Sequence, residues 1–151
     1  MGDQVAQDMV AVRIGPNLRT AIAASPAYLA EHGTPQTLDD LSRHQCITLR
    51  LGSGGLYAWE LTDQGKDLSV KVDGQVTFSG VYQMIQAAID GCGLVFATED
   101  LLQAEVDAGR LAWVMPEHCP VWPGWHVFYP SRRESSRALR LVIDALRSPA
   151  P

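Results

Sequence analysis

Hydrophobic positions in this chain repeat with two different spacings, which outline a series of short elements. Between residues 81 and 89, apolar side chains stand three or four positions apart, which is the spacing of one helix face. Between residues 68 and 72 they stand at every second position, as in a strand with one buried face. Short apolar runs at 45–50 and 94–97 predict buried strands.

Capping residues give the helices their predicted ends. Ser25 followed by Pro26 predicts a short helix over 27–31, and Thr37 with an acid three residues later predicts another that ends near residue 43. Ser79 is placed to cap the helix of residues 81–89, and Gly91 to end it. The remaining predicted elements are strands at 57–61 and 68–72 around a turn, a helix at 101–108, strands at 111–115 and 125–129, and a last helix that begins at Ser135 or Ser136.

Strands and helices alternate along most of the chain, with one hairpin inserted. This order predicts an α/β fold of three layers, in which helices cover both faces of a mixed, mostly parallel sheet. In such folds, ligands bind at the carboxyl ends of strands, beside the first turns of helices. Ser79 and the segment 98–100 both lie at predicted helix starts, where free N–H groups and hydroxyls could hold a carboxylate, although ordinary capping explains them equally well.

Composition narrows the class of protein. A chain of 151 residues with 46% hydrophobic and 19% charged residues fits one ordinary globular domain. Its net charge of −5 argues against direct nucleic-acid binding, and its one basic cluster, at Arg132, Arg133, Arg137 and Arg140, is predicted to be a solvated helix face. No apolar run is long enough to span a membrane and the N-terminus does not have the pattern of a signal peptide, so we expect a cytoplasmic protein.

Candidate catalytic groups are sparse, so we predict no enzyme activity, no metal site and no cofactor. The three cysteines stand far apart, which favours a reducing compartment, and Cys46 and Cys92 are expected to pack as small hydrophobic residues. His118 and Cys119 are adjacent, but neighbours in a proline-flanked loop seldom point together. The sequence Gly91-Cys92-Gly93 follows a helix and precedes a strand, the reverse of a dinucleotide-binding turn, and is predicted to be a turn only.

Blocks of sequence in a fixed order carry a family resemblance. The blocks S-P-A-Y-L at 25–29, D-L-x-x-H-x-C-I at 40–47 and Y-P-S-R-R at 129–133 occur in that order, together with AAIDGCGLVFATEDLL at 87–102. With them, the chain resembles the effector-binding domain of LysR-type transcriptional regulators over about residues 9–147. That domain has two lobes like those of a type 2 periplasmic binding protein, and a small organic acid, amino acid or aromatic metabolite binds between them.

The resemblance implies a division of this chain and a set of pocket residues. Residues 1–15 would be a crossing segment between lobes, residues 16–112 the second lobe, and residues 113–151 the returning strand and helix of a first lobe that is otherwise absent. The chain would then pair with a second copy, and DNA would be bound by a separate N-terminal winged helix-turn-helix. A stand-alone carrier of small solutes is the alternative. The implied effector-binding residues are Thr48, Leu49, Arg50, Leu51, Gly52, Ser53, Ser79, Gly80, Thr98 and Glu99.

Overall fold

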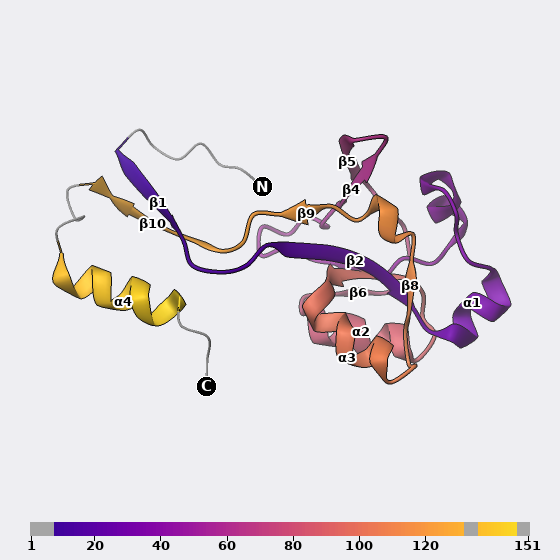
Figure 1. Ribbon diagram of the computed structural model, residues 1–151. Coiled ribbons are helices and arrows are strands. Elements are labelled where there is room, and N and C mark those ends of the chain that lie inside the picture. Colours follow the sequence, from indigo (N-terminus) through magenta and orange to yellow (C-terminus); the bar gives the residue numbers. More distant parts are fainter. Residues whose placement is uncertain (1–7, 132–135, 148–151) are drawn as a thin grey trace. The chain divides into compact units, whose positions relative to one another are not determined.

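The computed structural model describes residues 8–131 and 136–147, and the chain divides into two compact units (Figure 1). One unit contains residues 19–121, and the other combines residues 1–18 with 122–151. The larger unit carries all of the predicted effector-binding residues.

The larger unit is built around strands that pair in both directions. β2 (Leu18–Ala24) lies between β7 (Val95–Thr98) and β8 (Ala112–Val114) and is antiparallel to both, and it also pairs with β9 (Val121–Trp122). β3 (Thr48–Leu49) pairs in parallel with β6 (Thr77–Phe78). A parallel bridge between Cys46 and Leu94 links the start of the β3 segment to the start of the β7 segment. β3, β6 and β7 therefore run the same way, and their carboxyl ends lie at one edge.

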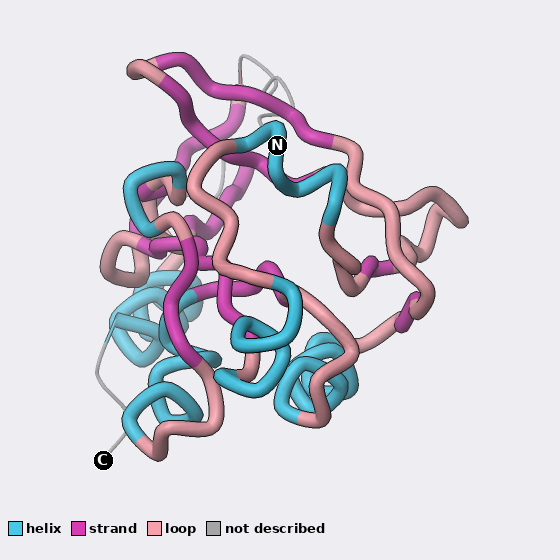
Figure 2. Tube along the Cα trace, turned by 90° about the vertical axis from the view of Figure 1, so that its right-hand side faces the viewer, coloured by secondary structure: helices cyan, strands magenta, loops and turns pink. Residues whose placement is uncertain are grey.

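Two longer helices cover one face of these strands (Figures 1 and 2). α2 (Val81–Ile89) contributes Met84, Ile85 and Ala88 to a core that also contains Ala23 and Val95 from the strands. α3 (Glu99–Asp107) adds Leu102, which is fully buried. The spacing of the apolar positions in 81–89 thus produced the helix and the buried face that it predicted.

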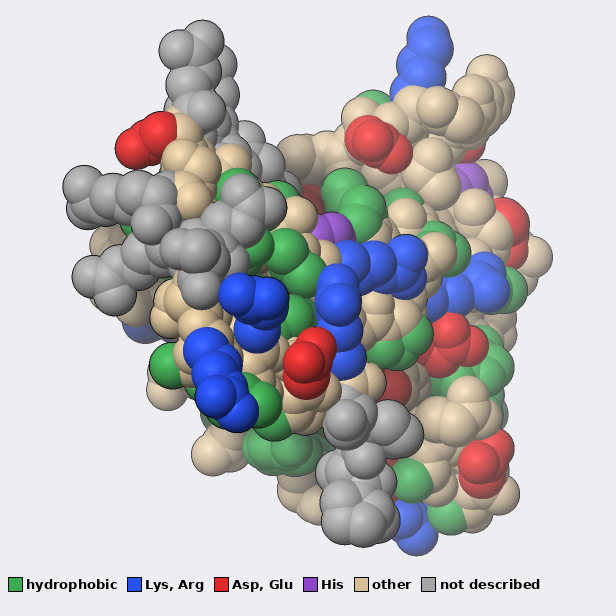
Figure 3. All heavy atoms as spheres, turned by 60° about the vertical axis from the view of Figure 1, so that its left-hand side comes forward, with side chains coloured by type: hydrophobic (Ala, Val, Ile, Leu, Met, Phe, Trp, Pro, Cys, Tyr) green, Lys and Arg blue, Asp and Glu red, His purple; other side chains and the backbone are tan. Residues whose placement is uncertain are grey.

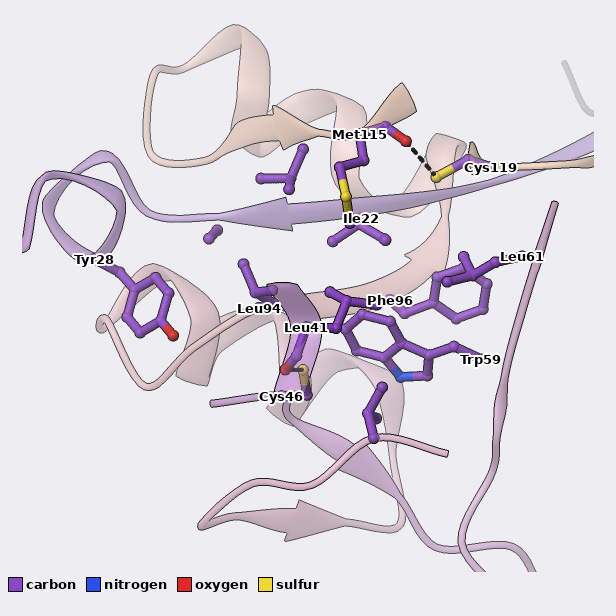
Figure 4. Close-up of a cluster of buried hydrophobic side chains, with 13 residues drawn as sticks. Ile22, Tyr28, Leu41, Cys46, Trp59, Leu61, Leu94, Phe96, Met115 and Cys119 are labelled. Carbon is purple, nitrogen blue, oxygen red and sulfur yellow. Dashed lines mark hydrogen bonds between the residues drawn. The ribbon is translucent and has the colours of Figure 1, made fainter. Parts of the chain in front are cut away.

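The opposite face is covered by shorter elements: α1 (Pro26–His32), the 3₁₀ helix η1 (Leu38–Arg43), and the antiparallel hairpin of β4 (Trp59–Asp63) and β5 (Lys66–Val70). Here Trp59 stacks on Phe96 with 5.3 Å between ring centroids, beside Ile22 and Leu61 (Figure 4). Three layers result, with the strands in the middle. A further 3₁₀ turn, η2 (Pro116–His118), follows β8.

The smaller unit pairs β1 (Met9–Arg13) with β10 (His126–Pro130) in an antiparallel ladder and carries α4 (Arg137–Arg147). Ile143 is the buried residue of α4, and Arg147 Nε donates to the carbonyl of Arg13 at 3.0 Å. Positive side chains stand beside exposed hydrophobic ones on the face drawn in Figure 3. The α4 residues Arg137, Arg140, Leu141, Val142, Leu146 and Arg147 are all exposed.

The α/β class and most of the predicted elements are confirmed, including the Ser25 cap of α1, whose side chain accepts from the Tyr28 N–H. The prediction of mostly parallel pairing was wrong, because β2 is antiparallel to β7 and β8. These neighbours lie far from β2 in sequence, so no single helical crossover sets their direction, and the alternation of elements could not reveal it.

Two local predictions also fail. Ser79 does not cap α2, because the N-cap is Gly80 and Ser79 lies one residue earlier, in a bend. Cys92 is exposed rather than packed, and it lies in the turn that follows α2. At α4, Ser136 Oγ accepts from the Leu139 N–H at 3.4 Å, whereas Ser135, Arg132 and Arg133 lie outside the described residues.

Within the described part of the chain, no helix is both long and apolar enough to cross a membrane. The same residues contain no group of three His, Cys, Asp or Glu side chains arranged to hold a metal ion.

Candidate functional site

The predicted effector-binding residues belong to three segments that follow parallel strands. Leu49 is in register with Phe78, and the Arg50 N–H donates to the Phe78 carbonyl at 2.7 Å, which places Arg50 beside Ser79. Thr98 ends β7, which runs parallel to β3. The structure therefore brings the three segments to one edge of the strands. We call this edge the rim and define it as residues 48–53, 79–80 and 98–99.

The loop after β3 is folded back on itself. The Leu51 N–H donates to the Gly55 carbonyl, the Gly54 N–H donates to the Leu51 carbonyl, each at 2.8 Å, and Arg50 Nη1 donates to the Gly54 carbonyl at 3.3 Å. The Tyr57 N–H then donates to the Leu49 carbonyl at 2.8 Å, which fixes the return of the chain. Residues 50–56 are exposed, so the loop presents its surface to solvent while its backbone is held in place.

Thr48 differs from the other rim residues because its side chain is buried and already engaged. Its hydroxyl lies 2.7 Å from the Thr77 hydroxyl and donates to the Val76 carbonyl at 3.3 Å. These bonds join β3 to the β6 segment. Thr48 thus supports the pairing of strands beneath the rim, and its position in the sequence did not reveal this.

Two helices, α2 and α3, begin at the rim, and neither has a side-chain cap at its start. The N-cap of α2 is Gly80, which has no side chain, and the side chain of Thr98, the N-cap of α3, accepts no hydrogen bond from the first turn. The first N–H groups of a helix have no partner within the helix and carry partial positive charge. Among described residues, the hydroxyls of Ser79 and Thr98 have no hydrogen-bond partner. These groups can receive a carboxylate or another polar acceptor.

The sequence did not reveal two residues beside these segments. The Gln83 side chain folds back over Gly80, so that a Cβ at Gly80 would meet Gln83 Oε1 at 2.3 Å. Thr20 is the register partner of Thr98 on β2. Gln83 lies one turn into a helix whose predicted start was Ser79, so the spacing alone could have suggested it. Thr20 depends on an antiparallel pairing that the sequence did not predict.

The adjacent histidine and cysteine of the η2 region have separate partners. His118 Nδ1 lies 2.8 Å from the Thr62 carbonyl, whereas Cys119 Sγ donates weakly to the Met115 carbonyl at 3.6 Å (Figure 4). Burial raises the pKa of the Cys119 thiol to about 11, which keeps it protonated at neutral pH. The geometry therefore does not form a histidine-activated thiolate.

Tyr28 of α1 and His44 are buried and form a polar cluster. The Tyr28 hydroxyl accepts from the Gln45 N–H at 2.9 Å and lies 3.1 Å from His44 Nδ1. The ring of His32 stacks on Tyr28 with centroids 4.3 Å apart. Burial lowers the pKa of His44, and the neighbouring His32 lowers it further, against an opposing effect of Asp40. This cluster ties α1 to the start of the β3 segment.

The matching family model and the similar proteins point to the same family. A family model described as the LysR substrate binding domain matches residues 1–150. The chain is 41% identical over 152 residues to a protein of Pseudomonas aeruginosa strain PAO1, a match that covers 100% of this chain and 50% of that protein. It is 35% identical over 148 residues to the HTH-type transcriptional regulator PgrR of Escherichia coli K12, covering 97% of this chain and 50% of PgrR. The chain thus spans about half the length of these curated relatives.

A shorter relative is also similar. YagP of Escherichia coli K12, a LysR family substrate binding domain-containing protein, is 26% identical over 105 residues, which cover 69% of this chain and 77% of YagP.

Solved structures agree with the fold. The regulatory domain of CrgA, a LysR-type transcriptional regulator from Neisseria meningitidis, has 27% sequence identity and a TM-score of 0.73, with 97% of this chain and 71% of that chain covered. The full-length structure of AphB, a virulence activator from Vibrio cholerae, has 23% sequence identity and a TM-score of 0.74, with 96% of this chain and 49% of that chain covered. This second likeness supports the fold. Together with the family-model match over nearly the whole chain, these likenesses show that the protein belongs to the LysR substrate-binding domain family.

Proposed function

We propose that this chain is the sensory part of a LysR-type transcriptional regulator and that it binds a small organic effector at the rim. The observation that carries the proposal is the convergence of three strand ends and two uncapped helix starts at one edge of the larger unit. An effector with a carboxylate would accept hydrogen bonds from the first turns of α2 and α3. The proposed contacts are Leu49, Arg50, Leu51, Gly52, Ser53, Ser79, Gly80, Thr98 and Glu99, with Thr48 beneath them.

The two compact units would correspond to parts of two lobes. Residues 19–121 would form the second lobe, and residues 1–18 with 122–151 would belong to the first. An effector that contacts both lobes would favour one arrangement of them, and that preference would reach DNA through an N-terminal helix-turn-helix. The name HTH-type, which PgrR carries, supports such a partner domain. A regulator of this kind performs no catalytic step and works in the cytoplasm, where bacterial DNA lies.

Association with a second copy is part of the proposal. Apolar side chains of the smaller unit, Phe128, Leu141, Val142 and Leu146, are each 49% to 62% exposed. Surfaces of this kind are commonly covered by another chain or by further parts of the same chain. Sedimentation velocity at micromolar concentrations should show a dimer or larger species, and a monomer under these conditions would contradict this part of the proposal.

Titration calorimetry on the complete regulator tests the site. A panel of aromatic and aliphatic acids should include a compound that binds saturably and loses about tenfold or more in affinity when Thr98→Val or Ser79→Ala removes a hydroxyl. Ser42→Ala, an exposed change on η1 outside the rim, is the control and should leave affinity unchanged. Binding that is indifferent to both rim variants would refute the assignment of the rim.

A stand-alone solute-binding protein is the second candidate, and the similarity to the shorter YagP favours it. The coding sequence directly upstream separates the two candidates. An in-frame helix-turn-helix supports the regulator, whereas its absence supports the carrier.

A further inference from the structure

A cavity of about 230 Å³ lies beside the rim, in the larger unit, where β2 begins and α3 starts. It is lined on its polar side by Arg19, Thr20 and Glu99, and on its apolar side by Ile22, Trp113 and Pro116. Pockets for drug-sized ligands usually measure about 300–1,000 Å³, so this cavity suits a smaller molecule. Glu99 is the residue that the cavity shares with the rim.

The charges in this cavity are opposite but not paired with each other. Arg19 and Glu99 are the chain neighbours of Thr20 and Thr98, the last register pair of the antiparallel strands β2 and β7, and both line the cavity. Arg19 Nη2 nevertheless turns to the Pro116 carbonyl, to which it donates at 3.1 Å. Among the described residues, neither Arg19 nor Glu99 has an ion-pair partner within 4.0 Å.

The other polar groups of the cavity are already engaged, so they do not compete for a ligand's charge. The Thr20 hydroxyl donates to the Pro120 carbonyl at 3.3 Å. The Cys119 thiol is buried, and its neighbour is the Met115 carbonyl. A guanidinium offers five N–H donors, and the bond to Pro116 uses one of them, which leaves donors for a carboxylate. The Glu99 carboxylate can accept from an ammonium group.

We infer that this cavity binds a zwitterionic ligand of the size and charge pattern of an α-amino acid. Arg19 would hold its carboxylate, Glu99 its ammonium group, and Ile22 with Trp113 would contact an apolar side chain. Because Glu99 also belongs to the rim, this inference rests on the proposed effector-sensing function and names the chemical class of the effector. A molecule that carries only one of the two charges would leave either Arg19 or Glu99 without a partner on the ligand. Such a molecule should therefore bind more weakly.

Calorimetry on the complete regulator at pH 7.5 tests the inference with matched compounds. Phenylalanine is compared with 3-phenylpropionate, which lacks the ammonium group, and with phenethylamine, which lacks the carboxylate. Leucine, 4-methylpentanoate and isoamylamine form the aliphatic series. At least one amino acid should bind, about tenfold or more tightly than both of its singly charged counterparts.

Two variants test which residue binds which charged group of the ligand. Arg19→Gln and Glu99→Gln should each weaken binding of the amino acid about tenfold to a hundredfold, and Glu99→Gln should also abolish its advantage over the acid that lacks the ammonium group. Asp107→Asn, at the other end of α3 and outside the cavity, and Arg43→Gln on η1 are the controls and should change little. Thermal unfolding of each variant checks that it is folded.

The outcomes separate this inference from the proposed function. If acids bind and depend on Thr98 while no amino acid binds, the inference is overturned and the sensory function stands. Equal binding of an amino acid and its singly charged counterparts, or an unchanged preference in Glu99→Gln, also overturns the inference. Absence of binding by every compound of both panels overturns the inference and the sensory function together.

Discussion

Replacing Gly93 by alanine should disrupt the pairing that brings the β3 and β7 segments together. A Cβ at this position would meet the Gln45 carbonyl oxygen at 2.1 Å, whereas ordinary contacts are 3.4–4 Å, so the two segments must separate by more than 1 Å. Two hydrogen bonds of 2.8 Å join them, from the Leu94 N–H to Gln45 and from the Ile47 N–H to Leu94. Gly93 also has a φ of +144°, which side-chain-bearing residues rarely adopt.

The expected cost follows from these contacts. Loss of two buried hydrogen bonds at about 1 kcal/mol each, with about 2 kcal/mol of backbone strain, gives a destabilisation of about 4 kcal/mol. For a chain of this length that lowers the melting temperature by about 8–16 °C. Urea unfolding followed by circular dichroism, with thermal scans, measures both quantities.

Gly91→Ala is the matched control within the same turn. Gly91 also has a positive φ, of +84°, but its Cβ would meet nothing closer than Ser25 Oγ at 3.8 Å. Only the backbone cost of about 1 kcal/mol applies there. If Gly93→Ala destabilises the protein no more than Gly91→Ala does, the close approach of the β3 and β7 segments is refuted.

Two further predictions concern titratable groups. Of the three cysteines, only Cys92 should react rapidly with Ellman's reagent in the native protein at pH 8, because burial raises the pKa of Cys46 to about 12 and that of Cys119 to about 11; rapid reaction of two or three thiols would contradict the buried positions. Because burial lowers the pKa of His44 in the folded state below its ordinary 6.5, the unfolded chain binds the proton more readily, and stability should fall as pH drops below about 6.5. Urea unfolding at pH 7.5 and 5.0 should show a smaller pH effect in His44→Gln, and an equal or larger one would exclude His44 as a source of the loss.

Local patterns in the sequence predicted helices well where interactions between residues a few positions apart determine where a helix starts and which of its faces is buried. The spacing of Val81, Met84, Ile85 and Ala88 predicted the buried face of α2, and Ser25 with Pro26 predicted the start of α1. Thr37 with Asp40 likewise begins η1, since the Thr37 N–H donates to the Asp40 carboxylate at 3.0 Å. Each of these features involves residues within a few positions of one another.

Features that depend on distant parts of the chain could not be predicted in this way. The direction of β2 relative to β7 depends on how the seventy intervening residues fold, and so does the placement of Arg19 and Glu99 in one cavity. The engagement of Thr48 with Thr77 depends on the parallel pairing of β3 and β6. The location of the rim was predicted because a family resemblance supplied the long-range arrangement that the local patterns lack.

Hydrogen–deuterium exchange on the complete regulator, with and without a bound effector, tests the position of the effector site most directly. We expect the effector to slow amide exchange in residues 48–53, 79–84 and 98–102, because the uncapped first turns of α2 and α3 would then donate to the ligand. Another cavity, of about 320 Å³, lies between η1 and the end of β5 and is lined by Leu38, Val70 and Asp73 among others. Protection confined to that cavity, with the rim unchanged, would contradict the assignment of the effector site.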